Sequence, residues 1–400
     1  MKTDVYISTK SGVDGISFAN LGLFTGFGSG IIGAVYSLIL LDILESSAMV
    51  GVYSAAYNAF GLVVALFFGE FLRVFSKAKL FYNCLIAVIA SYVMMSFSIK
   101  PGTFVALDFF SQVPLVLIGT LIPLFMTDFA GTDGYAKLNG RYHLWLNAGA
   151  LFAPMIAVAI AGRFGIRSAF MASAAMYVLC WLLFKHYRVV QEDKKIPKLS
   201  PRRTIMGVWR ETLRYFSRGA FARAYAVNFG YYALKSLRLL YMPIIVVESG
   251  FSKDTLGLVL TIGILPYVVL SEPIGRIAKK YGPVATRVGL AFGFLSFSAC
   301  AFALFFADGM TMLSLFVLWQ ISGAFQEALH DLVFFDVAKK AERARFYGIF
   351  NTSTNMPKFI TPLIGAAFIV VFGGATAAVW LAAGIIGILS TIVLLSGRKK

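Results

Sequence analysis

Apolar stretches long enough to cross a lipid bilayer constrain the fold of this sequence more than any other feature. A membrane-spanning helix needs about 20 predominantly apolar residues. Twelve such stretches follow one another: Phe18–Leu41, Ala48–Phe68, Leu80–Ile99, Phe104–Met126, His143–Ile160, Ser168–Phe184, Ala224–Val247, Leu256–Ile277, Val288–Ala307, Met310–Phe335, Phe346–Val371 and Ala375–Leu395. A backbone in lipid must satisfy its own hydrogen bonds. The pattern therefore predicts an all-α polytopic membrane protein with twelve transmembrane helices.

Composition supports the same class of protein. The mean hydropathy is +0.79, 59% of the residues are hydrophobic and only 14% are charged. These values are too apolar for a soluble two-domain protein and are typical of a chain that crosses a membrane many times.

The placement of basic residues predicts the topology. A formal net charge of +17 could indicate nucleic-acid binding. With the N-terminus inside, however, 29 of the 36 Lys and Arg residues fall in cytoplasmic segments, four in outer loops and three within the membrane. This positive-inside bias predicts that both termini are cytoplasmic and that the protein lies in the cytoplasmic (inner) membrane. It also assigns the basic excess to contact with anionic lipids at the cytoplasmic face rather than to nucleic acid.

A hydrophilic segment divides the chain into two predicted six-helix bundles. Residues 185–218 form this cytoplasmic linker between a bundle over 17–184 and a bundle over 219–400, and residues 1–16 form a cytoplasmic tail. Within the linker, apolar residues recur at roughly helical spacing among arginines: Ile205, Val208, Trp209, Leu213 and Phe216. This spacing predicts an amphipathic helix on the inner membrane surface. A solvated linker is the alternative.

The second half repeats features of the first. Arg141–Asn147 and Arg345–Asn351 share the spacing R-x5-N at the starts of the fifth and eleventh predicted helices. In each half a short basic turn, GEFLRVFSKAK or GRIAKKYGP, joins the second and third helices. Duplicated six-helix bundles are a common transporter design.

These turns resemble a motif of the major facilitator superfamily, and the resemblance covers essentially the whole chain. The turn GRIAKKYGP looks like that family's G-x-x-x-D-R-x-G-R motif, with Lys279 where the family usually has Asp. The first-half copy, Gly69 to Lys77, has Arg73 at that position. The family-turn residues of the better copy are Gly275, Arg276, Lys279, Lys280 and Gly282.

Two further segments are similar to motifs of the same family. GALFAP, residues 149–154, looks like a degenerate form of the G-x-x-x-G-P antiporter motif, although small residues and Pro also serve close helix packing. GRFGIRSAF, residues 162–170, looks like the G-W-R-x-x-F turn before the sixth helix. The resemblance implies that helices one, four, seven and ten surround a central cavity. Helices three, six, nine and twelve would then face outward.

Ionisable residues at membrane depth follow that arrangement. The predicted helices three, six, nine and twelve contain no Asp, Glu, Lys or Arg. The residues at depth lie on helices four, seven, ten and eleven: Asp108, Lys235, Arg238, Glu327, His330, Asp331 and Lys358. A cation at bilayer depth costs about 2.5–3.5 kcal/mol on the mildest scale. The partition therefore predicts that these helices line a hydrated interior.

Helical spacing gathers polar residues on one face of each of three helices. The three faces comprise Asn228, Tyr232 and Lys235, with Arg238 one turn further on; Gln320, Glu327 and Asp331; and Asn351, Asn355 and Lys358. Three cations then face two carboxylates. This surplus predicts a binding site for an anionic substrate. Internal ion pairs that only hold the three helices together are the alternative.

The first half contributes one main carboxylate at depth, Asp108, with Gln112 one turn away. A lone carboxylate in that place could carry a coupling proton. An outer-vestibule charge exposed to water is the alternative. Asn20, Tyr57 and Asn58 are the expected polar substrate contacts from this half, and each could equally satisfy a neighbouring backbone group.

Other function classes lack their sequence signals. No G-x-x-x-x-G-K-[ST] motif indicates ATP, and no His/Cys cluster or Ser-His-Asp grouping indicates a metal or a hydrolase. Cys84, Cys180 and Cys300 lie far apart inside apolar segments, as expected for packing residues. We therefore expect no enzyme activity, no cofactor and no metal.

Together these features predict a proton-coupled secondary active transporter that works by alternating access. Its substrate would be a small organic anion or an anionic amphipathic solute, bound near the midplane by a monomeric chain. The residues expected to couple protons or to gate are Asp108, Glu327, Asp331 and His330. One alternative is an efflux antiporter for drug-like or lipid-like compounds, favoured by the fifth-helix motif and an aromatic content of 15%. A non-transporting receptor or scaffold of the same fold is the other.

Overall fold

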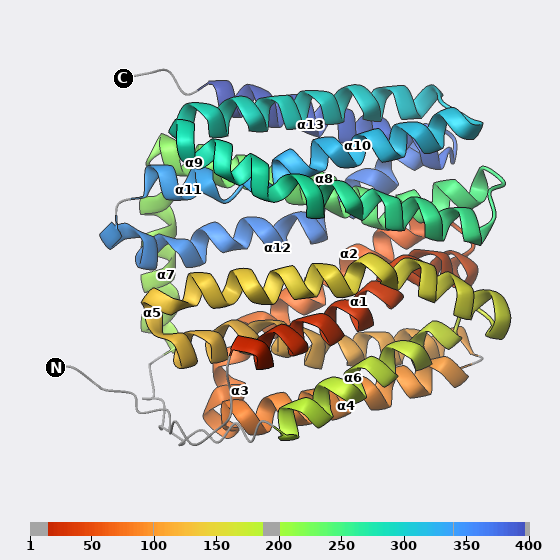
Figure 1. Ribbon diagram of the computed structural model, residues 1–400, viewed down its shortest axis with the longest axis horizontal. Coiled ribbons are helices and arrows are strands. Elements are labelled where there is room, and N and C mark those ends of the chain that lie inside the picture. Colours follow the sequence, from red (N-terminus) through yellow and green to blue (C-terminus); the bar gives the residue numbers. More distant parts are fainter. Residues whose placement is uncertain (1–14, 99, 187–200, 339, 397–400) are drawn as a thin grey trace. The chain divides into compact units, whose positions relative to one another are not determined.

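The computed structural model describes residues 15–98, 100–186, 201–338 and 340–396, and over these residues the chain is all-α, as predicted (Figure 1). The first half contains α1 (Gly15–Leu44), α2 (Ser47–Leu66), α3 (Phe68–Val74), α4 (Lys77–Phe97), α5 (Pro101–Phe164) and α6 (Ser168–His186). The second contains α7 (Pro201–Phe216), α8 (Gly219–Glu248), α9 (Lys253–Phe306), α10 (Gly309–Leu329), α11 (Leu332–Val337), α12 (Lys340–Val371), the 3-10 turn η1 (Thr376–Ala378) and α13 (Val379–Leu395). The predicted tail up to residue 14 and the linker residues 187–200 lie outside this description.

Eleven segments of the described helices are long and apolar enough to cross a membrane. The long helices α5 and α9 each contribute two of them: Pro101–Met126 and Leu144–Phe164, then Lys253–Ala278 and Lys280–Phe306. The spans of α9 meet near Gly282, where φ is 69° and ψ is −156°. That backbone conformation favours glycine, so Gly282 marks the turn between the two spans.

The predicted span missing from those eleven is α8. It is helical over 30 residues, and at about 1.5 Å per residue that length is ample for a bilayer. Asn228, Lys235 and Arg238 make its middle too polar for a purely apolar criterion. α8 therefore carries polar and charged side chains that a span facing lipid could not carry.

One predicted span is interrupted. α10 ends at Leu329 and α11 begins at Leu332, so the regular helix breaks within the predicted stretch Met310–Phe335. His330 and Asp331 nevertheless keep helical backbone angles, with φ/ψ of −59°/−39° and −71°/−29°. The interruption is local and leaves the span running in one direction.

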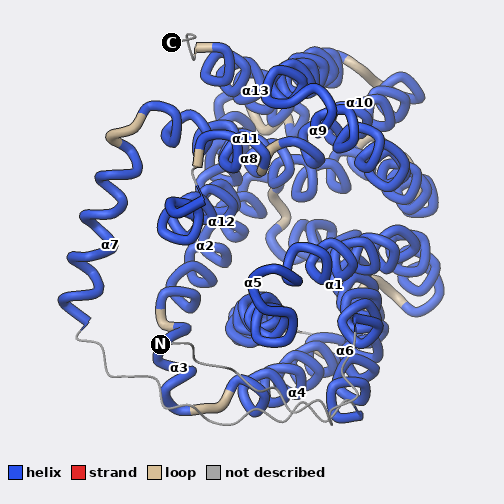
Figure 2. The backbone as a smooth tube through the Cα atoms, turned by 60° about the vertical axis from the view of Figure 1, so that its left-hand side comes forward, coloured by secondary structure: helices blue, strands red, loops and turns tan. Residues whose placement is uncertain are grey.

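The chain divides into two compact units, each described here by itself. Unit 1 comprises residues 1–39 and 59–197, and unit 2 comprises residues 40–58 and 198–400. In unit 1, α4 packs against α5 and α6. In unit 2, α9 packs against α10 and α13, and α8 packs against α12 and α13 (Figure 2). Unit 2 thus surrounds α8 with long helices.

Aromatic rings fill the interior of unit 2. Trp319 is 1% exposed, and its ring centroid lies 4.7 Å from that of Trp380 and 4.3 Å from that of Phe297. Aromatic pairs at such distances stabilise a core beyond the area that they bury. This packing makes unit 2 a firm frame for the polar residues of α8 and α10.

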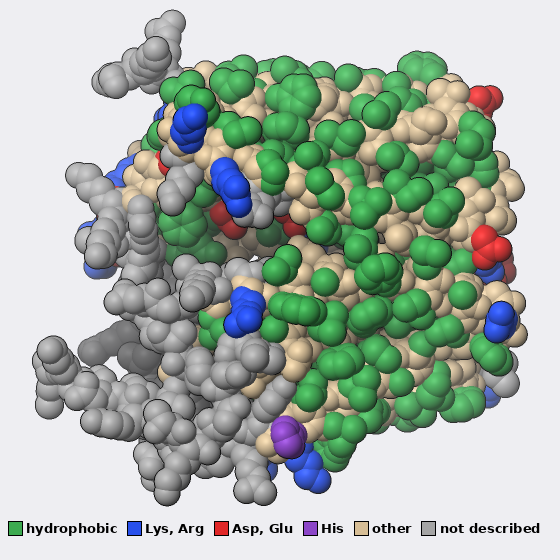
Figure 3. All heavy atoms as spheres, in the orientation of Figure 1, with side chains coloured by type: hydrophobic (Ala, Val, Ile, Leu, Met, Phe, Trp, Pro, Cys, Tyr) green, Lys and Arg blue, Asp and Glu red, His purple; other side chains and the backbone are tan. Residues whose placement is uncertain are grey.

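The outward surface is apolar, as a lipid-facing surface must be. On the face shown in Figure 3, hydrophobic side chains are spread along the described surface, and charged side chains lie mainly toward the ends of the long helices. On α13, for example, Leu389, Ile392 and Leu395 are 55%, 57% and 61% exposed. The three cysteines, all described, are unpaired.

Glycines let α1 and α5 of unit 1 touch through their backbones. A Cβ atom placed on Gly149 would lie 2.2 Å from the carbonyl oxygen of Leu23, and one on Gly26 would lie 2.0 Å from the carbonyl oxygen of Leu146. No real Cβ tolerates such distances, so only glycine permits this approach. Close packing therefore accounts for Gly149, the first residue of the segment that resembles an antiporter motif.

We predict that Gly149→Val destabilises the protein, because the new side chain must push α1 away from α5. Overpacking of this kind costs about 1–3 kcal/mol, and a thermal melt of the purified protein should show a lower Tm. Gly162→Val is the matched control, since a Cβ atom there meets nothing within 4 Å. Equal Tm values for the two variants would contradict the close contact.

Candidate functional site

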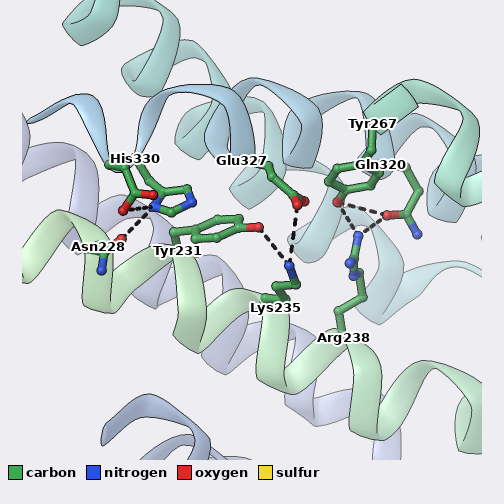
Figure 4. Close-up of polar contacts among 9 residues, drawn as sticks. Asn228, Tyr231, Lys235, Arg238, Tyr267, Gln320, Glu327 and His330 are labelled. Atoms are coloured by element: carbon green, nitrogen blue, oxygen red, sulfur yellow. Dashed lines mark hydrogen bonds and ion pairs between the residues drawn. The ribbon is translucent and has the colours of Figure 1, made fainter. Parts of the chain in front are cut away.

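Polar side chains of α8, α9 and α10 meet inside unit 2, as Figure 4 shows. α8 supplies Asn228, Tyr231, Lys235 and Arg238, whose spacing of three or four residues places them along one side of the helix. The other sides of α8 carry buried apolar residues that pack against neighbouring helices. The sequence of α8 thus aims one polar stripe at α9 and α10.

Lys235 and Glu327 form the central ion pair of this group. The Lys235 Nζ atom lies 3.7 Å from Glu327 Oε1, and both side chains are about one-third exposed, at 32% and 29%. Lys235 also donates a hydrogen bond of 3.1 Å to the Tyr231 hydroxyl. The ammonium group therefore lies between a tyrosine hydroxyl and a carboxylate with which it is not in tight contact.

Arg238 is held by neutral groups. Its guanidinium donates hydrogen bonds to the hydroxyl of Tyr267 and to Oε1 of Gln320, and it lies 5.1 Å from the centroid of the Tyr267 ring. Among the described residues, no carboxylate lies within ion-pair distance of Arg238. A guanidinium has five N–H donors, so Arg238 is oriented without being neutralised.

His330 lies at the end of a buried hydrogen-bond chain whose direction can be assigned. Ser353 donates to the Phe350 carbonyl oxygen, so its Oγ atom accepts from Nδ2 of Asn228 at 2.7 Å. The Oδ1 atom of Asn228 is then left facing His330 Nδ1 at 2.6 Å. A carbonyl oxygen only accepts, and Nδ1 must therefore carry the hydrogen. In the neutral ring the other nitrogen, Nε2, then carries no hydrogen.

The surroundings of His330 are aromatic on one side and acidic on the other. The ring is 5% exposed and stacks on Tyr231 with centroids 4.3 Å apart and planes at 14°. Asp331 Oδ1 lies 3.3 Å from Nδ1. Because Tyr231 contacts both His330 and Lys235, the histidine and the ion pair belong to one connected cluster.

The predicted polar residues of α12 are exposed. Asn351, Asn355 and Lys358 are all exposed, and the Lys358 Nζ atom lies 3.5 Å from Asn355 Oδ1. Their exposure on a helix that carries a membrane span, Ile349–Val371, means that they are not packed into the core of unit 2.

In unit 1, Asp108 is buried rather than exposed. It is 2% exposed and accepts a 2.6 Å hydrogen bond from the Tyr36 hydroxyl. Gln112 is 8% exposed and its amide fits against Gly61, where a Cβ atom would lie 2.4 Å from Nε2. Asn20, also in unit 1, is partly buried.

Two predicted contacts on α2 belong to unit 2. Asn58 donates to the carbonyl oxygen of Ser54 at 2.7 Å, so its amide is satisfied within its own helix. Tyr57 is partly buried. Asn58 thus fits the local alternative that the sequence left open.

Comparison with known families decides the identity of this fold. The family model described as Major Facilitator Superfamily matches residues 18–242 and again residues 225–400, which together cover nearly the whole chain. The chain belongs to the major facilitator superfamily. A comparison with curated proteins finds no match.

Solved structures of transporters share this superfamily fold. The nucleoside transporter NupG is 13% identical with a TM-score of 0.75, covering 96% of this chain and 98% of that one. A D-xylose-proton symporter is 16% identical with a TM-score of 0.71, covering 95% and 96%. A POT family transporter in complex with 5-aminolevulinic acid is 12% identical with a TM-score of 0.75, covering 96% and 95%. The superfamily and these neighbours indicate a transporter rather than an enzyme.

The superfamily turn between the two spans of α9 is described in part. Gly282 adopts the positive φ that its motif position requires, and the Lys280 Nζ atom lies 5.1 Å from the centroid of the Tyr281 ring. Gly275 is partly buried and Arg276 is exposed, while the Lys279 side chain lies outside the description. No group of three or more His, Cys, Asp or Glu among the described residues could hold a metal ion.

Sequence reasoning missed four residues of these clusters: Tyr36, Tyr231, Tyr267 and Ser353. Tyr231 precedes Lys235 by one helical turn, so the spacing rule that selected Lys235 could have found it. Tyr36, Tyr267 and Ser353 reach their partners from other helices. Nothing in a single sequence reports how neighbouring helices are rotated.

We predict that Asn228→Leu lowers the stability of the protein, because it removes the acceptor of His330 Nδ1 and the donor to Ser353. Each buried polar group left unpaired costs about 1–3 kcal/mol, and Tm should fall accordingly. Asn351→Leu, a change at an exposed asparagine of α12, is the control. If both variants melted at the same temperature, the buried hydrogen bonds of Asn228 would contribute nothing to the stability of the protein.

Proposed function

We propose that this protein is a secondary active transporter that moves a small organic anion across the cytoplasmic membrane by alternating access, with proton coupling. Membership of the superfamily supports transport. Two structural neighbours, a D-xylose-proton symporter and a transporter in complex with 5-aminolevulinic acid, are compatible with proton coupling and with a substrate that bears a carboxylate.

The observation that supports an anionic substrate is the presence of two cations, Arg238 and Lys358, that have no carboxylate within ion-pair distance among the described residues. Arg238 is oriented by Tyr267 and Gln320, which are both neutral. Lys358 is exposed and has a neutral amide beside it. Of the three cations Lys235, Arg238 and Lys358, only Lys235 has a carboxylate within ion-pair distance among the described residues. A carboxylate or phosphate would supply the missing charge, and a guanidinium binds such groups with two parallel hydrogen bonds.

The loose ion pair supports a mechanism for proton coupling. An anionic substrate and Glu327 compete for the same ammonium group of Lys235. Protonation of Glu327 removes its charge and leaves Lys235 to the substrate. The coupling free energy between two binding events is the same in both directions. A substrate bound to Lys235 therefore also favours the binding of a proton to Glu327. Proton and anion would then bind together.

Further residues belong to this proposal. His330 contacts the same cluster through Tyr231, and Asp331 lies beside it, so this pair is a second place for a proton. The buried Asp108, hydrogen-bonded to Tyr36, is a third. We assign both chain ends to the cytoplasm from the distribution of basic residues, and we keep the division into two bundles joined by residues 185–218.

The test is ligand binding by purified protein. We expect small carboxylic acids, presented as a panel with their neutral amides, to raise Tm, and the amides to leave it unchanged. A ligand at about 100 times its Kd stabilises by about 2.7 kcal/mol. Arg238→Gln should abolish the shift, because the variant keeps a hydrogen-bonding side chain but loses the charge.

Lys253→Gln is the matched control, since it removes one positive charge at the start of α9, outside the polar cluster. That variant should keep the full shift. Amides that stabilise as well as acids, or an unchanged shift in Arg238→Gln, would refute an anion site at α8.

A further inference from the structure

The helix α7 has three distinct sides. It runs at a steep angle to α8 and α12 of the same unit (Figures 1 and 2). Successive residues of a helix are rotated by about 100°, and the described residues of α7 therefore separate into a docked side, an apolar side and a basic side. Each side contacts different surroundings.

The docked side is held by Tyr215. This residue is fully buried in a cluster with Phe221, Phe334 and Phe346, and its ring centroid lies 5.1 Å from that of Phe221 and 5.7 Å from that of Phe346. Just beyond the helix, Arg218 pairs with Glu342. The C-terminal end of α7 therefore packs against α8, α11 and α12.

The apolar side is uncovered. Trp209, Leu213 and Phe216 follow a spacing of four and then three residues, which places them on one face. They are 65%, 55% and 43% exposed. Trp209 and Leu213 lie on a different side of the helix from Tyr215. Phe216 also borders the docked side, because its ring centroid lies 5.2 Å from that of Tyr215 and 5.0 Å from that of Tyr225. Contiguous exposed apolar side chains mark a surface that something else covers.

The basic side flanks the apolar one. Arg210 and Arg214 are exposed and each follows an apolar residue, Trp209 or Leu213, by one position. Glu211 lies 3.1 Å from Arg214 and compensates one of these charges in part. An apolar face bordered by arginine is the pattern of helices that lie in the plane of a membrane surface.

We infer that α7 binds the anionic lipid surface of the protein's own membrane, with Trp209, Leu213 and Phe216 among the upper acyl chains and Arg210 and Arg214 on lipid phosphates. Two observations select this occupant. The helix lies across α8 and α12, so its residues stay near one depth at the end of those spans. Its arginines match the negative charge of the leaflet that the basic residues of the chain identify as cytoplasmic.

Tryptophan fluorescence in nanodiscs with one chain per disc tests this inference. The signal of Trp209 is the difference between wild type and Trp209→Phe, which keeps an aromatic ring. We expect brominated phosphatidylglycerol to quench this difference signal, more strongly with bromine near the headgroup than near the chain end. Acrylamide in the water should quench it weakly. Leu213→Trp in the Trp209→Phe background should restore the quenchable signal, since position 213 lies on the same face.

Charge dependence supplies the second readout. Arg210→Gln combined with Arg214→Gln should at least halve the bromolipid quenching in discs that contain phosphatidylglycerol and leave quenching in neutral phosphatidylcholine unchanged. Lys253→Gln is the charge-matched control. Equal quenching in discs with phosphatidylglycerol and in discs with phosphatidylcholine, for every variant, would contradict the role of the arginines. Efficient quenching by acrylamide, or protection from both quenchers as beneath a protein partner, would overturn lipid binding itself.

Discussion

The cost of placing charge at membrane depth governs this structure, and the pair of Lys235 and Glu327 shows how the protein meets that cost. An isolated cation in a bilayer is expensive, yet here the ammonium has a carboxylate at 3.7 Å and a tyrosine hydroxyl at 3.1 Å. The same constraint explains the separation of residue types. Lys235, Arg238 and Glu327 lie on helices whose polar faces meet, whereas α13 exposes Leu389, Ile392 and Leu395 to its surroundings.

The cations of α8 differ in a way that suits a transport cycle. Lys235 is paired loosely with a titratable partner, so its availability can change with protonation. Arg238 is held by Tyr267 and Gln320, whose charge does not change near neutral pH. In the transport cycle that we propose, a fixed guanidinium beside a switchable ammonium would give an anion a permanent contact and a conditional one. Proton binding and anion binding would then reinforce each other through the conditional contact.

Much of the fold could be predicted from the sequence because lipid imposes length and hydropathy on each span. The stretches Phe104–Met126 and Ser168–Phe184 both lie within described helices. Hydropathy averages over many residues, so it could not predict the interruption at His330 and Asp331. That feature depends on hydrogen bonds and packing at individual positions.

The candidate site was predictable only where one helix suffices to define it. Spacing along α8 selected Lys235 and Arg238, and the structure places Glu327 and Gln320 opposite them. Partners such as Tyr267 depend on the rotation of another helix, which leaves no mark in the sequence. Gly149 shows the converse, because its place in a motif-like segment is explained by the backbone of α1 beside it.

Transport by Glu327→Gln in proteoliposomes tests the coupling of proton and anion most directly. The variant mimics a permanently protonated carboxyl group, so Lys235 stays available to the substrate. We predict that exchange of labelled for unlabelled carboxylic acid across the membrane continues, while accumulation driven by a pH gradient is lost. Undiminished accumulation in response to the gradient would contradict the proposed competition between Glu327 and substrate for Lys235.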